Sequence, residues 1–69
     1  MSPTLLRHLW SLVEGANSTI LLTLDDQHLV QWLLDQLSGQ RSIDKTEADH
    51  LGRYIHSRVS LIRDIAQSR

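Results

Sequence analysis

The sequence has no cysteine, a single proline and no apolar run of about 20 residues, the length that spans a bilayer. The absence of cysteine excludes disulfides, thiolate zinc sites and thiol catalysis, and it fits a reducing compartment. Met1 leads directly into Ser2, Pro3 and an amphipathic segment interrupted by Arg7 and His8, so no secretory hydrophobic region is expected. We therefore expect an intracellular, cytoplasmic protein without a membrane partner.

An excess of basic charge is also absent, because the net charge of the 69 residues is -1. The charges are unevenly placed, with three basic and seven acidic side chains in residues 1–49 and four arginines against Asp64 in residues 50–69. The chain thus lacks the net basic footprint of a nucleic-acid-binding domain, although its C-terminal part forms a local basic end.

The length predicts a single small helical domain over residues 1–69, with no internal repeat, low-complexity tract or linker. A core of this size only just offsets the conformational entropy of the chain, and no disulfide reinforces it. Oligomerisation is the most natural stabiliser of such a chain, so we expect a homodimer.

Residues 44–68 show the strongest helical periodicity in the sequence. At about 100° per residue they separate into an apolar half and a polar half. Asp44 and Glu47 form a capping box at the start, and Ile43 can pack on Ala48 as a hydrophobic staple. The pattern predicts one helix of about 35 Å. Since this exceeds what a compact domain of this size needs, we expect the far end to contact the first helix or another chain.

Two shorter amphipathic segments come before this helix. One begins after a Ser-Pro pair and covers residues 3–16, and the other covers residues 23–38 with Thr23 as its cap. The expected fold is all-α, a three-helix arrangement built on an antiparallel hairpin of about 23–38 and 44–68. The helix of about 3–16 packs across the hairpin, and the whole dimerises into a larger bundle.

The connection from Asn17 to Leu22 has a mixed pattern. Its first residues indicate a turn, whereas Ile20 to Leu22 are too apolar for an exposed loop. A short strand remains possible, but an isolated strand needs a second chain to satisfy its backbone. We expect a buried connector in which Leu22 is part of the core.

Arg58 interrupts the apolar half of the helix predicted over residues 44–68. A guanidinium at that position needs an acidic partner or must reach solvent along its stem. An antiparallel hairpin places Arg58 level with Asp25 and Asp26, and Asp26 falls inside the apolar arc of its own helix. We therefore predict a buried ion pair between Arg58 and Asp26, within one chain or across a dimer.

Candidate sites for chemistry are weak in this sequence. Glu47 and His50 have the Glu-x-x-His spacing of di-metal helices, but Glu14 and Asp35, the carboxylates that would complete such a site, lie on polar faces of their helices. No nucleophile elbow, phosphate-binding loop or acid–base pair is present. We expect no enzymatic activity, no metal site and no cofactor.

The wide apolar arcs and the aromatic residues favour protein–protein interaction. They predict a small adaptor, regulator or assembly factor that binds itself and an unidentified protein. The candidate interaction surface combines the aromatic residues with the tail of the last helix: Trp10, Trp32, Tyr54, Leu61, Ile62 and Ile65.

A small DNA- or RNA-binding regulator is the alternative. It would use the exposed face of the C-terminal helix, which carries Arg53, His56 and Arg63. Asp49 and Asp64 lie on the same predicted face and halve its charge. Nucleic acid is therefore the less favoured partner.

Overall fold

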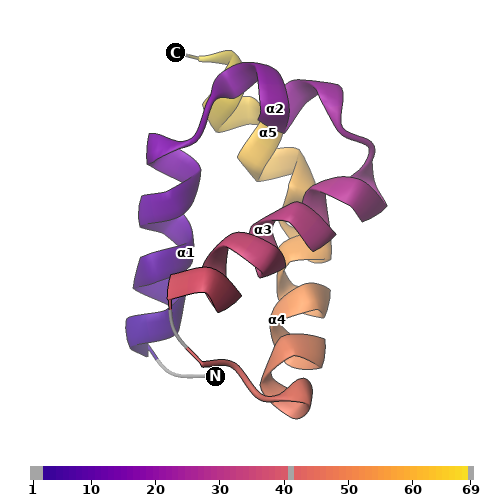
Figure 1. The fold of residues 1–69 in the computed structure, drawn as a ribbon. Coiled ribbons are helices and arrows are strands. Elements are labelled where there is room, and N and C mark those ends of the chain that lie inside the picture. Colours follow the sequence, from indigo (N-terminus) through magenta and orange to yellow (C-terminus); the bar gives the residue numbers. More distant parts are fainter. Residues whose placement is uncertain (1–2, 41, 69) are drawn as a thin grey trace.

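The computed structural model describes residues 3–40 and 42–68, and within them it confirms an all-α fold (Figure 1). Five helices take the place of the three that we expected, because the connector forms a helix of its own and the long C-terminal helix is divided. Their bounds are α1 Pro3–Gly15, α2 Ser18–Thr23, α3 Asp26–Gln40, α4 Lys45–Ser57 and α5 Val59–Gln67.

The helices are arranged around one core. Figure 1 shows α1 on one side, α4 continuing into α5 on the other, α3 crossing obliquely between them and α2 lying across one end. The most extensive contacts join α2 to α5 and α3 to α4. The radius of gyration is 11.2 Å, against about 11 Å expected for a compact chain of this length.

The core consists of apolar side chains from all five helices, and no charged or polar residue of the described chain is buried within it. Spacings of three and four residues place these side chains on one face of each helix, as the amphipathic pattern requires. The buried residues are Leu5, Leu9, Val13, Leu21, Leu29, Leu33, Leu37, Leu51, Ile55, Val59, Ile62 and Ala66.

The connector is helix α2, and the prediction that Leu22 is buried is wrong. Asn17 caps the helix by accepting a hydrogen bond from the Thr19 backbone N–H at 2.8 Å. A helix of six residues buries only one side, and here Leu21 occupies that side with no exposed surface while Leu22 is 39% exposed. The helical hydrogen bonds also satisfy the backbone, so no partner strand is needed.

The cap of α3 is Asp25, which corrects the assignment to Thr23. Thr23 is the last residue of α2, and Leu24 follows in an extended conformation with φ -71° and ψ 143°. Asp25 Oδ1 accepts from the His28 backbone N–H at 2.8 Å and contacts His28 Nδ1 at the same distance. These two hydrogen bonds, the backbone bond foremost, lower the pKa of Asp25 below its ordinary value.

The long C-terminal helix begins where the sequence predicts but is broken at Arg58. Asp44 Oδ1 accepts from the Glu47 backbone N–H at 2.7 Å, which confirms the predicted cap. Arg58 has φ -113° and ψ 9°, so α4 ends before it and α5 begins after it. The bend places α5 against α2, and the longest dimension of the molecule is 31 Å.

The accessible surface gives no independent reason for a dimer. The chain exposes 4474 Å², close to the value of about 4400 Å² that its mass of 7.9 kDa predicts for a folded monomer. Burial of the core is therefore complete within one chain, and the homodimer stays a prediction.

Candidate interaction surface

The predicted buried ion pair between Arg58 and Asp26 is wrong. Arg58 is exposed, and its guanidinium carbon lies 5.2 Å from the centroid of the Tyr54 ring. Its Nη1 donates a long hydrogen bond of 3.5 Å to Ser57 Oγ. The prediction assumed a straight helix, whereas the bend places Arg58 at the corner between α4 and α5, where its side chain reaches solvent.

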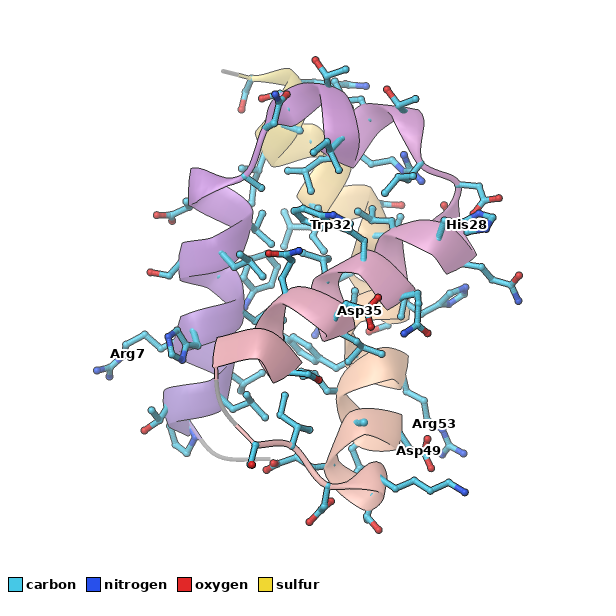
Figure 2. All side chains as sticks on the ribbon, in the orientation of Figure 1. Arg7, His28, Trp32, Asp35, Asp49 and Arg53 are labelled. Atoms are coloured by element: carbon cyan, nitrogen blue, oxygen red, sulfur yellow. The ribbon has the colours of Figure 1, made fainter. Side chains whose placement is uncertain are left out.

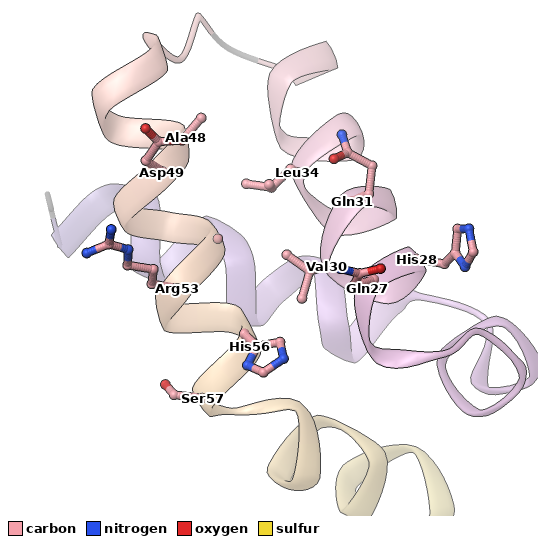
Figure 3. Close-up of a pocket in the computed structure, with 11 residues that line it drawn as sticks. Gln27, His28, Val30, Gln31, Leu34, Ala48, Asp49, Arg53, His56 and Ser57 are labelled. Carbon is pink, nitrogen blue, oxygen red and sulfur yellow. The ribbon is translucent and has the colours of Figure 1, made fainter.

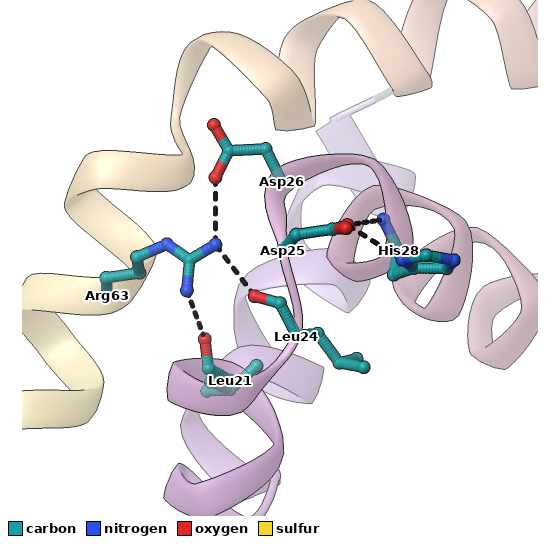
Figure 4. Close-up of polar contacts among 6 residues, drawn as sticks. All are labelled: Leu21, Leu24, Asp25, Asp26, His28 and Arg63. Atoms are coloured by element: carbon teal, nitrogen blue, oxygen red, sulfur yellow. Dashed lines mark hydrogen bonds and ion pairs between the residues drawn. The ribbon is translucent and has the colours of Figure 1, made fainter.

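Asp26 pairs with Arg63 instead (Figure 4). Arg63 Nη2 donates to Asp26 Oδ1 at 2.8 Å and to the Leu24 carbonyl at 2.9 Å, and Nη1 donates to the Leu21 carbonyl at 3.2 Å. We call these three contacts the Arg63 clasp. The arginine side chain is 24% exposed and Asp26 is 60% exposed, so the pair lies at the rim of the core rather than inside it.

The face proposed for nucleic acid is divided by this clasp. Arg63 is engaged with α2 and α3, while Arg53 and His56 are exposed on α4. Arg7 and Arg53 lie on opposite sides of the molecule (Figure 2). Asp49 is one turn from Arg53 on α4, so the basic residues of the described chain form no continuous cationic face.

A groove lies between α3 and α4 (Figure 3). Val30 and Leu34 point from α3 toward α4, where Ala48 and Gly52 complete an apolar floor. A Cβ atom on Gly52 would lie 3.6 Å from Leu34 Cδ1, an ordinary contact distance, so the two helices pack closely here. The groove is open to solvent, and its lining also includes polar side chains from both helices, among them Gln31, Arg53 and His56.

A second cluster joins α1 to the junction of α4 and α5, and we call it the aromatic cluster: Trp10, Tyr54 and Arg58. Trp10 Nε1 donates to the Tyr54 hydroxyl at 3.1 Å, and the two rings meet edge to face at 83° with centroids 6.3 Å apart. The guanidinium of Arg58 lies over the ring of Tyr54. Trp10 and Tyr54 are both partly exposed, so the cluster forms part of the surface.

The cluster contains two of the predicted interaction residues and one that the sequence had assigned to a buried ion pair. Trp10 and Tyr54 were singled out as aromatic residues, a type enriched at contact surfaces. Sequence reasoning missed Arg58 here because it assigned the guanidinium to an acidic partner on the facing helix, whereas the side chain lies over Tyr54 one turn earlier. An arginine four residues after a tyrosine on a helix is the signal that would have suggested the stacking.

The remaining candidates separate into exposed and buried residues. Leu61 is 47% exposed and Ile65 is partly buried, whereas Ile62 has no exposed surface, so its assignment to an interaction surface is wrong. Ile62 is directed into the core by the same spacing that buries Val59. Trp32 is partly buried and lines a separate groove between α1 and α3 (Figure 2).

No metal centre is assembled in the described part of the chain, where no three histidine or carboxylate side chains come together. Asp35, one of the carboxylates weighed for such a site, instead accepts a hydrogen bond from Gln31 Nε2 at 3.0 Å. Among residues 3–40 and 42–68, no helix is both long and apolar enough to cross a membrane.

The candidate interaction surface is identified by this geometry alone. Comparisons of the chain with protein-family models, with curated proteins and with solved structures give no match.

Proposed function

We propose that this chain is a protein–protein interaction module that binds a partner protein through the aromatic cluster and the neighbouring Leu61. The observation that carries the proposal is the edge-to-face pair of Trp10 and Tyr54 with Arg58 stacked on it at the surface. The proposal includes the roles expected from the sequence, those of an adaptor, regulator or assembly factor.

The composition of the cluster supports a binding role. Tryptophan, tyrosine and arginine are the residue types most enriched among the few that carry most of the binding energy at protein interfaces. Leu61 adds an exposed apolar side chain three residues after Arg58, and a partner that covered it would remove that surface from water. Single exposed leucines are common, so the support comes from the combination.

The hydrogen bonds of the aromatic cluster also suit burial by a partner protein. The Trp10 N–H is satisfied by the Tyr54 hydroxyl, so a partner can bury the indole without leaving a donor unpaired. Within residues 3–40 and 42–68, Arg58 makes one long hydrogen bond, so its guanidinium retains donors for a carboxylate. A partner that presents an apolar side chain beside an acidic one fits this surface.

Nucleic-acid binding has less support, because a phosphate-binding surface needs several free cations on one face. On the face weighed for nucleic acid, Arg63 is held in the clasp and Arg53 lies one turn from Asp49. Binding of DNA or RNA that weakens steeply with salt would contradict this ranking.

Two exposed leucines provide a matched pair for the test. Leu61 belongs to the proposed surface and is 47% exposed, whereas Leu22 lies on α2 and is 39% exposed. Wild-type chain, Leu61→Asp and Leu22→Asp are immobilised, and proteins captured from an extract of the source cells are compared by mass spectrometry. We expect a partner that binds the wild type and Leu22→Asp but not Leu61→Asp. Equal capture by all three chains would contradict the proposed surface.

A further inference from the structure

The bend at Arg58 occurs in a stretch that has no helix breaker. From Arg53 to Gln67 there is neither glycine nor proline. The buried residues of α4 and α5 follow one another at steps of three and four across the bend, and in a straight helix they would share an arc of about 80°. They are Leu51, Ile55, Val59, Ile62 and Ala66.

The local distortion is small and confined to one residue. Arg58 differs from helical dihedral angles by about 50° in φ and in ψ. Its N–H still donates to the Ile55 carbonyl at 2.9 Å, and its carbonyl accepts from the Ile62 N–H at 2.9 Å. No side chain caps the start of α5. Straightening therefore disturbs little of the backbone.

The contacts that favour the bend come partly from nearby side chains. Ser57 Oγ donates to the Tyr54 carbonyl at 2.7 Å, a back-bonding that bends helices. Arg58 stacks on Tyr54 one turn earlier. Both contacts lie within α4 and its last turn, so neither ties α5 to the rest of the domain.

The contacts that tie α5 to the domain lie farther along the helix. They are the burial of Val59, Ile62 and Ala66 and the Arg63 clasp, which reaches the end of α2 and the start of α3. None of these contacts requires α5 to come from the same chain. An identical α5 from another copy presents the same side chains to the same site.

We propose that Arg58 is a hinge through which two copies of this chain exchange α5. In the exchanged dimer α4 and α5 form one straight helix in each copy, and each α5 packs on α2 of the other copy. The occupant is a second copy because the interface is the one already present within the chain, and exchange of an identical element is a low-cost route to a dimer. This inference does not depend on the function proposed for the aromatic cluster.

The two forms differ at the hinge, so residue 58 should set the balance between them. In a continuous helix an interior alanine is favoured over an interior glycine by about 0.8–1.0 kcal/mol, which corresponds to about a four- to fivefold change per hinge. An exchanged dimer straightens two hinges, so its dissociation constant should differ about 15- to 30-fold between Arg58→Ala and Arg58→Gly. Both variants lose the guanidinium equally, which makes each the control of the other.

Sedimentation equilibrium from micromolar to millimolar concentration measures this difference. We expect dimers of Arg58→Ala that are about 15- to 30-fold tighter than those of Arg58→Gly. Equal dissociation constants, or a monomeric Arg58→Ala at millimolar concentration, would overturn the proposal. Because Arg58 is exposed and outside the core, both variants should fold, and circular dichroism verifies this.

An isotope-filtered NMR experiment separates exchange from ordinary docking. Labelled and unlabelled Arg58→Ala chains are unfolded together, refolded and concentrated, and contacts between the two kinds of chain are recorded. Exchange predicts contacts from Leu21 of one copy to Ile62 and Arg63 of the other. Intercopy contacts confined to other surfaces, such as Trp10 or Leu61, would show a conventional dimer and would overturn the hinge.

Discussion

Two helix junctions in this molecule reverse or bend the chain by different means. Between α2 and α3 the chain passes through an extended Leu24 to Asp25, which caps α3, and the Arg63 clasp holds both helix ends. Between α4 and α5 only Arg58 departs from helical geometry, and no side chain caps α5. The first junction is fixed by several contacts, whereas the second has few.

The difference shows two ways in which a helix break arises. At the α2–α3 junction, aspartate at the cap competes with the helical backbone and stops one helix while starting another. At the α4–α5 junction the local sequence is compatible with a continuous helix, and burial of the α5 face against α2 favours the bend. In the monomer, the stability of a break of the second kind should respond more to substitutions at the contacts of α5 with α2 than to substitutions at the break itself.

The largest loss of stability should follow from removing a buried side chain beside the junction of α2 and α3. Leu21 is fully buried, so Leu21→Ala should destabilise the domain by about 3–4 kcal/mol through lost burial and a residual cavity. Leu22→Ala, at the exposed neighbouring position, should cost less than about 0.5 kcal/mol. Urea unfolding followed by circular dichroism measures both, and similar losses would mean that α2 presents a different side to the core.

The Arg63 clasp should have the next largest effect. Arg63→Ala removes three hydrogen bonds and leaves the Leu21 and Leu24 carbonyls without this partner, so a loss of about 2–3 kcal/mol is expected. Asp26→Ala is the control, because its exposed ion pair should contribute less than about 1 kcal/mol. If the two substitutions cost the same in urea unfolding, the ion pair and not the carbonyl contacts holds the junction.

The Asp25 cap predicts a pH dependence of stability. Because hydrogen bonds from His28 lower the folded pKa of Asp25, its contribution is present above the unfolded value of about 4 and is lost as the pH falls through the lower folded pKa. Asp25→Asn keeps an oxygen acceptor without the charge and should flatten this part of the profile. Thermal unfolding of both chains from about pH 6 to pH 2 tests this, and parallel profiles would contradict it.

The smallest effect is expected at the weakly fixed junction. In the monomer Arg58→Ala loses only an exposed stacking on Tyr54, so the stability of the monomer should fall by only about 0.5 kcal/mol. Urea unfolding at low concentration, where the chain is monomeric, makes the measurement. A loss above about 2 kcal/mol would show that Arg58 fixes the bend as firmly as Arg63 fixes the other junction.

Local signals in the sequence predicted local structure well. The all-α fold, the helix start at Asp44 and the amphipathic faces of α1 and α3 follow from capping residues and periodicity, which act over one or two turns. The cap of α3 was misplaced because Thr23 and Asp25 both offer a capping side chain, and only the burial of α2 favours Asp25. The sequence alone does not decide between two capping residues that lie two positions apart, because the choice depends on which side chains are buried.

The candidate site was only partly predictable for the same reason. Trp10 and Tyr54 stood out by residue type, but the exchange of roles between Arg58 and Arg63 depends on the bend. A straight helix places Arg58 toward α3 and Arg63 in solvent, and the bend reverses both placements. Long-range packing therefore decides which arginine is available to a partner.

The Arg63 clasp also has a consequence for the order of folding. Arg63 lies 42 positions after Leu21 and 39 after Leu24, and α2 has only six residues, too few to be helical alone in water. The chain must therefore close a long loop before α2 gains its support, which places this helix among the last parts to form. In native-state hydrogen exchange the amides of α2 and α5 should open together, as one cooperative unit distinct from α3 and α4.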